Sequence, residues 1–217
     1  VNSCRDLLSP HLRKGQLIVL KSTVPTGTTR AFARDLEATS GLTADEDFFV
    51  AYWPERTIEG HALHELGMLP KIIGGLGDRS SRMLEPIVRH LGGRPIVVSS
   101  PELAEMCKLA DNSYRAVNIA FANEIGSVCE AIGLAAKELV TAINEGYERT
   151  SLLQSGLGAG GPCLSKDPPV LAGSAIALGI ETPVVTASIG SNIEATLRIA
   201  TVVETYIRQR GIVNPHL

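Results

Sequence analysis

Cys163 lies in the glycine-rich stretch Ser155–Asp167, whose sequence is SGLGAGGPCLSKD. Most isolated cysteines pack as inert small side chains on apolar helix faces. Here the glycines let other groups approach the backbone closely, and a helix that begins near Ser165 would direct its N-terminal amides toward the sulfur. Lys166 adds positive charge. The pattern therefore predicts a nucleophilic thiol.

The same stretch imitates a dinucleotide-binding loop. Gly156, Gly158 and Gly161 match the pattern GxGxxG, and Glu181 stands where the ribose-binding carboxylate of that fingerprint would be expected. The fingerprint also requires a buried strand before it and a helix directly after it. A polar stretch precedes these glycines and a proline and a cysteine follow them. We therefore reject the dinucleotide interpretation.

Lys108 and Asn112 are four residues apart in an apolar, helix-like stretch, so they share one helix face. Asp111 and Arg115 extend the polar side of that helix. One interpretation is a solvated stripe, and taken alone the residues favour it. The other interpretation is that the lysine and the asparagine donate hydrogen bonds to a developing oxyanion.

Further polar residues follow predicted strands. Thr23 comes after the first strand, and Glu55 and Glu59 follow the second, within YWPERTIEG. They could be ordinary surface groups, but open α/β sheets bind ligands at the carboxyl ends of their strands. His61 and His64 have no third metal ligand nearby in the sequence, so we interpret them as surface histidines.

The elements that would position these side chains follow from the apolar pattern. Nearly unbroken β-branched runs predict strands, and the stretches between them have helical periodicity. The predicted strands are Gln16–Lys21, Phe48–Trp53, Lys71–Gly75 and Pro95–Ser99, and the helices between them are Thr28–Thr39 and Asp78–Leu91. Alternating strands and helices predict an α/β domain with a parallel sheet covered on both faces.

The strand signals cease after Ser99-Ser100, and helices alone are predicted beyond it. The first begins at Pro101 and runs for about 30 residues to Gly133. Later helices are predicted near Ala136–Ile143, Lys166–Leu178 and Pro183–Arg210. We therefore place one domain at residues 1–99 and an all-helical domain at residues 100–217.

The bulk composition excludes some classes of protein. The chain has 217 residues and a net charge of −3, which gives no field that would attract nucleic acid or an anionic membrane. No apolar stretch reaches the length of a transmembrane helix. Four cysteines without a CxxC pair indicate neither a zinc site nor a disulfide framework. We expect a soluble, cytoplasmic protein.

Five motifs, in this order, resemble the UDP-glucose, UDP-N-acetylhexosamine and GDP-mannose 6-dehydrogenase family. They are KSTVPTGTT (Lys21–Thr29), PERTIEG (Pro54–Gly60), LPKIIGG (Leu69–Gly75), EMCKLADNSYRAVNIAFANEI (Glu105–Ile125) and GLGAGGPCLSKDP (Gly156–Pro168). The resemblance implies the C-terminal half of a Rossmann-like NAD-binding sheet, followed by a helical central domain of the 6-phosphogluconate-dehydrogenase type. It also implies that NAD removes hydride twice from a sugar C6.

The resemblance assigns roles to the residues named above. Cys163 would capture the aldehyde as a thiohemiacetal and carry it to a thioester. Lys108 and Asn112 become oxyanion stabilisers, and Glu55 acts in thioester hydrolysis. The water-ordering residues are Asp167, Thr23 and Glu59. The residues near the nicotinamide are Thr23, Glu59 and Lys166, and those near the sugar nucleotide are Glu55, Lys108, Asn112, Ser155, Gly156 and Gly160.

The family also carries a glycine-rich NAD turn ahead of the part that Val1 begins and a further α/β domain beyond Leu217. We therefore expect a fragment that holds most catalytic side chains yet is inactive alone, and that forms a homodimer through the helical domain. Pro162 stands where relatives often have His, Ser or Tyr.

The substrate that the resemblance favours is UDP-N-acetyl-D-mannosamine, because Ala62–Gly75 resembles that branch, and the pathway would be polysaccharide biosynthesis. The alternatives are a UDP-glucose 6-dehydrogenase, a non-catalytic dimerisation fragment, and a β-hydroxyacid or 6-phosphogluconate-type dehydrogenase that needs no cysteine.

Overall fold

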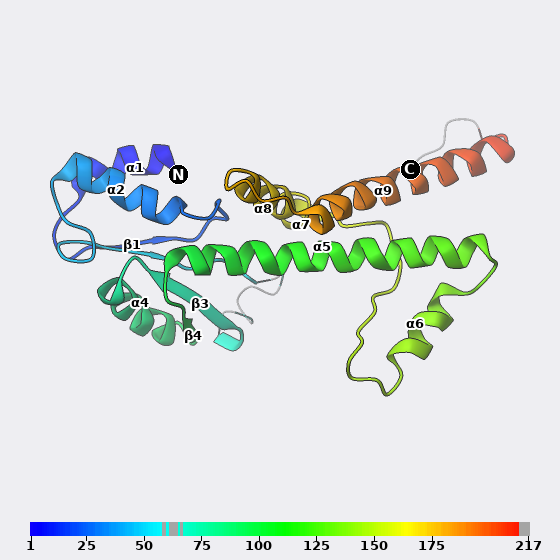
Figure 1. The fold of residues 1–217 in the computed structure, drawn as a ribbon, viewed down its shortest axis with the longest axis horizontal. Helices are drawn as coiled ribbons and strands as arrows, with labels where there is room; N and C mark the ends of the chain where they lie inside the picture. The colour runs from blue at the N-terminus through cyan, green and yellow to red at the C-terminus, as the bar shows by residue number, and fades with distance from the viewer. Residues whose placement is uncertain (58–59, 61–64, 66, 213–217) are drawn as a thin grey trace. The chain divides into compact units, whose positions relative to one another are not determined.

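The computed structural model describes residues 1–57, 60, 65 and 67–212, which form two compact units, Val1–Ala110 and Asp111–Leu217 (Figure 1). Glu59, His61 and His64 lie outside the described residues. The domain boundary predicted near Ser99-Ser100 falls in the short segment ahead of the long helix and stays a prediction.

The first unit is built on a four-stranded sheet of order β1-β2-β3-β4. The strands are β1 (Leu17–Leu20), β2 (Phe49–Tyr52), β3 (Pro70–Gly75) and β4 (Arg94–Val97), each within two residues of its predicted bounds. β1 pairs with β2 in parallel, and β3 with β4 in parallel. β2 and β3 run antiparallel, so the α/β class is confirmed but the sheet is mixed rather than fully parallel.

The antiparallel pair has a direct geometric reason. A parallel pair needs a connection that crosses back over the sheet, whereas β3 begins at the end of the sheet where β2 ends. Strand periodicity carries no information on direction, so the sequence could not distinguish the two cases. As a result, the carboxyl ends of β1 and β2 lie at one edge of the sheet, and those of β3 and β4 at the other.

Helices cover both faces of this sheet (Figure 1). α2 (Thr28–Ser40) packs Phe32 and Leu36 against Val50 of β2. α4 (Asp78–His90) packs Leu84 and Val88 against Ala51, the next residue of β2, which faces the other side. Both covering helices were predicted, and the double-sided burial explains why the strands read as unbroken apolar runs.

One element of the first unit was not predicted. α1 (Asn2–Leu8) and the 3-10 turn η1 (Ser9–His11) precede β1. They are held to α2 by polar contacts, Arg5 to Asp35 at 2.5 Å and the Ser9 hydroxyl to that of Thr39 at 2.6 Å. Leu7 is 74% exposed, so this helix has little apolar periodicity for a sequence reading to detect.

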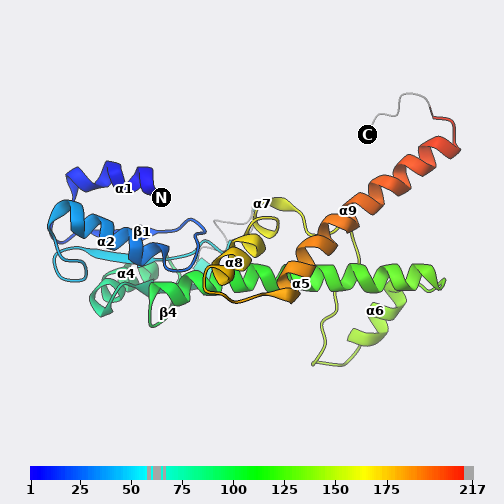
Figure 2. The same cartoon turned by 45° about the horizontal axis from the view of Figure 1, so that its top comes forward.

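The second unit consists of helices, with no strand among its described residues. α5 (Pro101–Ala131) begins in the first unit and continues into the second, and its 31 residues confirm the predicted long helix. The others are α6 (Ala136–Asn144), α7 (Gly161–Leu164), α8 (Asp167–Ile176) and α9 (Pro183–Gln209). α6 and α9 lie on opposite sides of α5 in both views (Figure 1, Figure 2). Within the described part of the chain, no helix combines the length and apolarity needed to span a bilayer.

Candidate active site

Cys163 is an exposed residue inside the single helical turn α7. The Lys166 N–H donates to the Cys163 carbonyl oxygen at 3.3 Å, and the Ser165 hydroxyl donates to the Gly161 carbonyl oxygen at 2.8 Å. The following helix, α8, begins at Asp167, with Lys166 as its N-cap. The helix predicted near Lys166–Leu178 is confirmed, but Cys163 lies before it in the separate turn α7.

The first residue of α8 is tied to α5 by a buried polar contact. Asp167 has no exposed surface, and Asn112 is 2% exposed. The Asn112 Nδ2 donates to the Asp167 Oδ2 at 2.5 Å, while the exposed Lys166 lies with its Nζ 3.8 Å from the Asp167 Oδ1. A carboxylate removed from water needs such a donor. Two predicted site residues, Asn112 and Asp167, are thus in contact, and Asp167 lies four residues after Cys163.

Lys108 is buried one helical turn before Asn112 on α5, with 7% of its surface exposed. Arg115, on the polar side proposed from the sequence, is exposed. The solvated-stripe interpretation is therefore wrong for Lys108 and Asn112, because groups facing solvent would not be buried to this degree. Lys108 and Asn112 are thus buried polar groups on one face of α5, and their role as oxyanion donors stays a prediction.

The glycine-rich loop before Cys163 is held by two asparagines that the sequence reading missed. The Gly156 N–H donates to the Asn123 Oδ1 at 2.7 Å, and the Ala159 N–H donates to the Asn192 Oδ1 at 3.1 Å. Asn123 lies on α5 and Asn192 on α9, and both are buried. Ser155, Gly156 and Gly160 are exposed, and their assignment to the substrate stays a prediction. The loop leads into a four-residue turn rather than a long helix, which agrees with rejecting the dinucleotide fingerprint.

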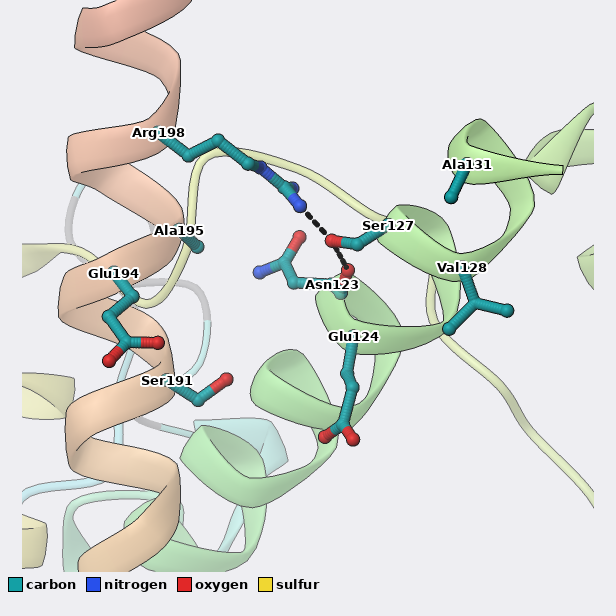
Figure 3. Close-up of a pocket in the computed structure, with 9 residues that line it drawn as sticks. All are labelled: Asn123, Glu124, Ser127, Val128, Ala131, Ser191, Glu194, Ala195 and Arg198. Carbon is teal, nitrogen blue, oxygen red and sulfur yellow. Dashed lines mark hydrogen bonds between the residues drawn. The ribbon is translucent and has the colours of Figure 1, made fainter. Parts of the chain in front are cut away.

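A cavity of about 570 Å³ lies between α5 and α9 in the second unit (Figure 3). Asn123 lines it, and its buried Nδ2 makes no hydrogen bond to the part of the chain that the structure describes. Arg198 reaches across from α9 to the Ser127 hydroxyl. None of the site residues predicted from the sequence lines this cavity, so the cavity does not coincide with the predicted catalytic residues.

In the first unit, the ends of β1 and β2 bring polar groups to one sheet edge. The Lys21 Nζ lies 3.3 Å from the Glu55 Oε2 and 3.8 Å from the centre of the Trp53 ring. The Tyr52 hydroxyl donates to the Ser22 carbonyl oxygen at 3.1 Å, which fixes the backbone next to half-buried Thr23. The parallel register of β1 and β2 thus brings Lys21, two residues before Thr23, into contact with Glu55.

Glu55 is a charged carboxylate at neutral pH. Partial desolvation would raise its pKa, but hydrogen bonds from Thr57 and the charge of Lys21 outweigh it and lower the pKa of Glu55 to about 2. A group with so low a pKa is a weak general base. It can orient a water molecule and stabilise positive charge that develops nearby.

Glu105 is a second carboxylate that the sequence reading did not single out. It has no exposed surface, and it accepts hydrogen bonds from the Gly27 N–H at 2.6 Å, the Thr29 N–H at 2.8 Å and the Thr29 hydroxyl at 2.6 Å. The donors at the N-terminus of α2 are thereby satisfied from α5. Burial raises the pKa of Glu105 by more than these hydrogen bonds lower it.

Among the described residues, no three His, Cys, Asp or Glu side chains cluster as metal ligands would. All four cysteines are free thiols.

Comparisons with known proteins identify the family of the chain. Residues 1–92 match the NAD binding domain of the UDP-glucose/GDP-mannose dehydrogenase family, and residues 102–194 match the central domain of the same family. The chain belongs to that family, and it carries the family's NAD-binding domain over residues 1–92.

The chain is also similar to individual members of the family. An NDP-N-acetyl-D-galactosaminuronic acid dehydrogenase of Ralstonia solanacearum and a UDP-N-acetyl-D-mannosamine dehydrogenase of Yersinia pestis are each 37% identical over 175 residues, which is 77% of this chain and 41% of each relative. The structure of a UDP-D-ManNAc dehydrogenase from Pyrococcus horikoshii matches 97% of this chain and 49% of that chain, with 30% identity and a TM-score of 0.88. The chain thus spans less than half the length of these proteins.

Proposed function

We propose that the polypeptide carrying this chain oxidises the C6 hydroxyl of a nucleotide sugar to a carboxylate, with NAD as hydride acceptor and Cys163 as nucleophile. The observation that carries the proposal is the buried pair of Asn112 and Asp167, placed four residues from an exposed thiol in a glycine-rich loop. A structural cysteine would need neither the exposure nor the neighbouring buried carboxylate.

The reaction would proceed in balanced steps. Loss of hydride and of the hydroxyl proton converts the alcohol to an aldehyde, and the thiol of Cys163 adds to that carbon to form a thiohemiacetal. Loss of a second hydride and a proton yields a thioester. Water then breaks the carbon–sulfur bond, which releases the carboxylate and restores the thiol. NAD supplies the hydride acceptor for both oxidations when it is bound.

The residues of α5 and α8 would stabilise the oxygen that carries charge in these steps. The Asn112 amide nitrogen carries two hydrogens, and one of them is directed to Asp167. The bond fixes the orientation of the amide, so its second N–H can serve as a donor to a substrate oxygen. Lys108 would supply a positive charge from the same helix face. Asp167 would thus act both as a support for Asn112 and as a group that orders water.

The first unit would contribute the groups at the ends of β1 and β2. The Thr23 hydroxyl would contact the nicotinamide. Glu55, which is charged at neutral pH, would orient the water that hydrolyses the thioester. The residues fit the nicotinamide end of NAD rather than its pyrophosphate, because Glu105 already occupies amides at the N-terminus of α2. The remaining assignments are proposals too: Glu59 and Lys166 near the cofactor, and Ser155, Gly156 and Gly160 near the sugar nucleotide.

The substrate proposed first is UDP-N-acetyl-D-mannosamine, because several relatives at 36–37% identity carry that name. UDP-glucose is the alternative within the same reaction. A cytoplasmic location and a role in polysaccharide biosynthesis would follow from such a substrate.

The test is a Cys163→Ser variant of the polypeptide that contains this chain, assayed with NAD against UDP-N-acetylmannosamine, UDP-N-acetylglucosamine, UDP-glucose and GDP-mannose. Loss of steady NADH production, with a stalled ester on the new serine detected by intact mass, is expected. Cys107→Ser is the matched control and keeps its turnover. Unchanged NADH production in Cys163→Ser would remove the thioester mechanism.

A second candidate function is non-catalytic pairing through the helical unit, and one observation favours it. Large apolar side chains are exposed on α5, including Phe121 at 52% and Val128 at 53%. Faces of this kind commonly become subunit interfaces. We propose a homodimer on this basis. Sedimentation of the chain at high concentration tests it, and a strictly monomeric species would count against the dimer.

A further inference from the structure

We propose that Asn192 is a positioning residue for Cys163, which it holds over one turn of α5 by fixing the glycine-rich loop. The inference rests on the proposed function, in which Cys163 is the nucleophile. It concerns contacts inside the second unit alone.

Asn192 joins three parts of that unit with one side chain. Its Oδ1 accepts a hydrogen bond from the Ala159 N–H at 3.1 Å, and its Nδ2 donates to the Ala116 carbonyl oxygen at 3.0 Å. The side chain belongs to α9, and the residue is only 7% exposed. Both ends of a buried amide are therefore satisfied, one by the loop and one by α5. An arrangement of this kind fixes one geometry, because any other would leave buried polar atoms unpaired.

The bond at Ala159 has a counterpart on the other side of the cysteine. Ala159 lies four residues before Cys163, and Asp167 lies four residues after it. Asp167 is bonded to Asn112 of α5, and Asn192 connects Ala159 to Ala116 of α5. Asn112 and Ala116 are one helical turn apart. The backbone on both sides of the cysteine is thus attached to the same turn of the same helix.

Other side chains fix the loop farther from the cysteine. Asn123 accepts from the Gly156 N–H at 2.7 Å, and Thr196 donates to the Leu157 carbonyl oxygen at 2.9 Å. Asn144 of α6 makes two bonds of 2.9 Å with the backbone of Leu152. Figure 3 shows Asn123 projecting from α5 toward α9. The set forms a series of anchors, and Asn192 holds the position nearest to Cys163.

The bonds matter most near α7, because the packing around that turn is incomplete even though Gly158 lies close to α9. A cavity of about 300 Å³ lies beside the loop and α7, lined by Leu164, Ser165, Pro168 and Ile193 among others. Tight packing is therefore not what fixes the turn that carries the cysteine. Glycines lose more conformational freedom on ordering than other residues. A loop with four glycines therefore samples many conformations unless hydrogen bonds hold it in one.

A structural role alone would predict something different from a positioning role. Loss of a purely structural bond lowers stability and affects every kinetic parameter through the folded fraction. Loss of a positioning bond lowers kcat of the folded enzyme, because a misplaced nucleophile reacts slowly while the sugar nucleotide still binds. The two roles are separated by the split between kcat and KM and by a variant that restores one bond.

The experiment compares Asn192→Ala and Asn192→Asp in the polypeptide that contains this chain, with amide hydrogen exchange at Ala159 and steady-state kinetics as readouts. The Asp variant keeps an acceptor for the Ala159 N–H and loses the donor to Ala116. In Asn192→Ala we expect exchange at Ala159 to accelerate and kcat to fall, each by roughly tenfold, the equivalent of one net hydrogen bond. KM for the sugar nucleotide should stay within about threefold. Asn192→Asp should recover protection at Ala159 and part of kcat.

Asn118→Ala is the matched control, because that amide donates within its own helix to the Tyr114 carbonyl oxygen. Asn123→Ala supplies a contrast: it frees Gly156, which we place near the sugar nucleotide, and should raise KM more than it lowers kcat. Should Asn192→Ala fail to fold, Thr196→Val takes its place with a smaller expected fall in kcat.

The proposal is overturned if exchange at Ala159 does not change, if kcat is unaffected in the folded variant, or if Asn192→Asp is as impaired as Asn192→Ala. Failure of the proposed function looks different. In that case Cys163→Ser retains turnover, or the unmodified protein oxidises no nucleotide sugar, whatever exchange at Ala159 does.

Discussion

The two units place their site residues by different physical means. In the first, Thr23 and Glu55 are carried to one edge by the parallel register of β1 and β2, and the contact between Lys21 and Glu55 is partly exposed. In the second, the exposed Cys163 is positioned by bonds to buried side chains, Asn112 to Asp167 and Asn192 to Ala159. The first arrangement should tolerate loss of a side chain, while the second should not, because a buried polar group without a partner is costly.

The largest expected effect tests the buried pair. Asp167→Ala leaves the amide of Asn112 without its acceptor and should lower the free energy of unfolding by about 3 kcal/mol. Asp167→Asn keeps an acceptor of the same shape and should cost less than half as much. Chemical denaturation of both variants measures the difference. Equal losses would show that the hydrogen bond is not what holds α8 to α5.

The glycine loop offers a matched pair for the next effect. Gly158 has φ +93°, and a Cβ there would lie 2.7 Å from the Asn192 carbonyl oxygen, whereas a Cβ at Gly160 would meet nothing within 4 Å. Gly158→Ala should therefore destabilise by about 2 kcal/mol, and Gly160→Ala by less than about 0.5 kcal/mol. Thermal unfolding checks both. A Gly158→Ala protein as stable as Gly160→Ala would contradict the close approach of the loop to α9.

The glycine-rich loop also shows which features of the fold and the site can be predicted from the sequence. Apolar periodicity predicted each strand and the long helix, since those signals are local in the chain. The glycine-rich loop and Cys163 could be recognised because unusual residue types were concentrated there. Asn123 and Asn192 could not, because each binds backbone 33 residues away and an asparagine on a helix carries no mark of its partner. The antiparallel pairing of β2 with β3 and the polar contacts that hold α1 to α2 were also missed, because they too depend on partners distant in the chain.

Glu105 is a buried carboxylate of the first unit and, like Asp167 in the second, it is held by hydrogen bonds from buried donors. Burial raises its pKa above the ordinary 4.5, despite donors from Thr29 and Gly27. Its protonation therefore stabilises the fold fully below pH 4.5, and this contribution is lost as pH rises through the raised pKa. The free energy of unfolding of the unmodified protein, relative to Glu105→Gln, should fall over that rise. Denaturation at a series of pH values tests it, and a flat difference would mean that Glu105 is not shifted.

The smallest expected effect belongs to the sheet edge. Replacing Lys21 by Met removes the charge 3.3 Å from Glu55, but that carboxylate keeps its hydrogen bonds from Thr57. Because the pair is partly exposed, stability should change by less than about 1 kcal/mol. The pKa of Glu55 should rise from about 2 yet remain below 4.5, so its stabilising contribution, present above pH 4.5, would be lost at a somewhat higher pH as the solution is acidified. Carboxyl NMR titration measures this. If the pKa of Glu55 returned fully to 4.5, Lys21 rather than the backbone after β2 would be what keeps Glu55 charged. The contrast between residues placed by strand register in the first unit and residues placed by buried hydrogen bonds in the second would then weaken.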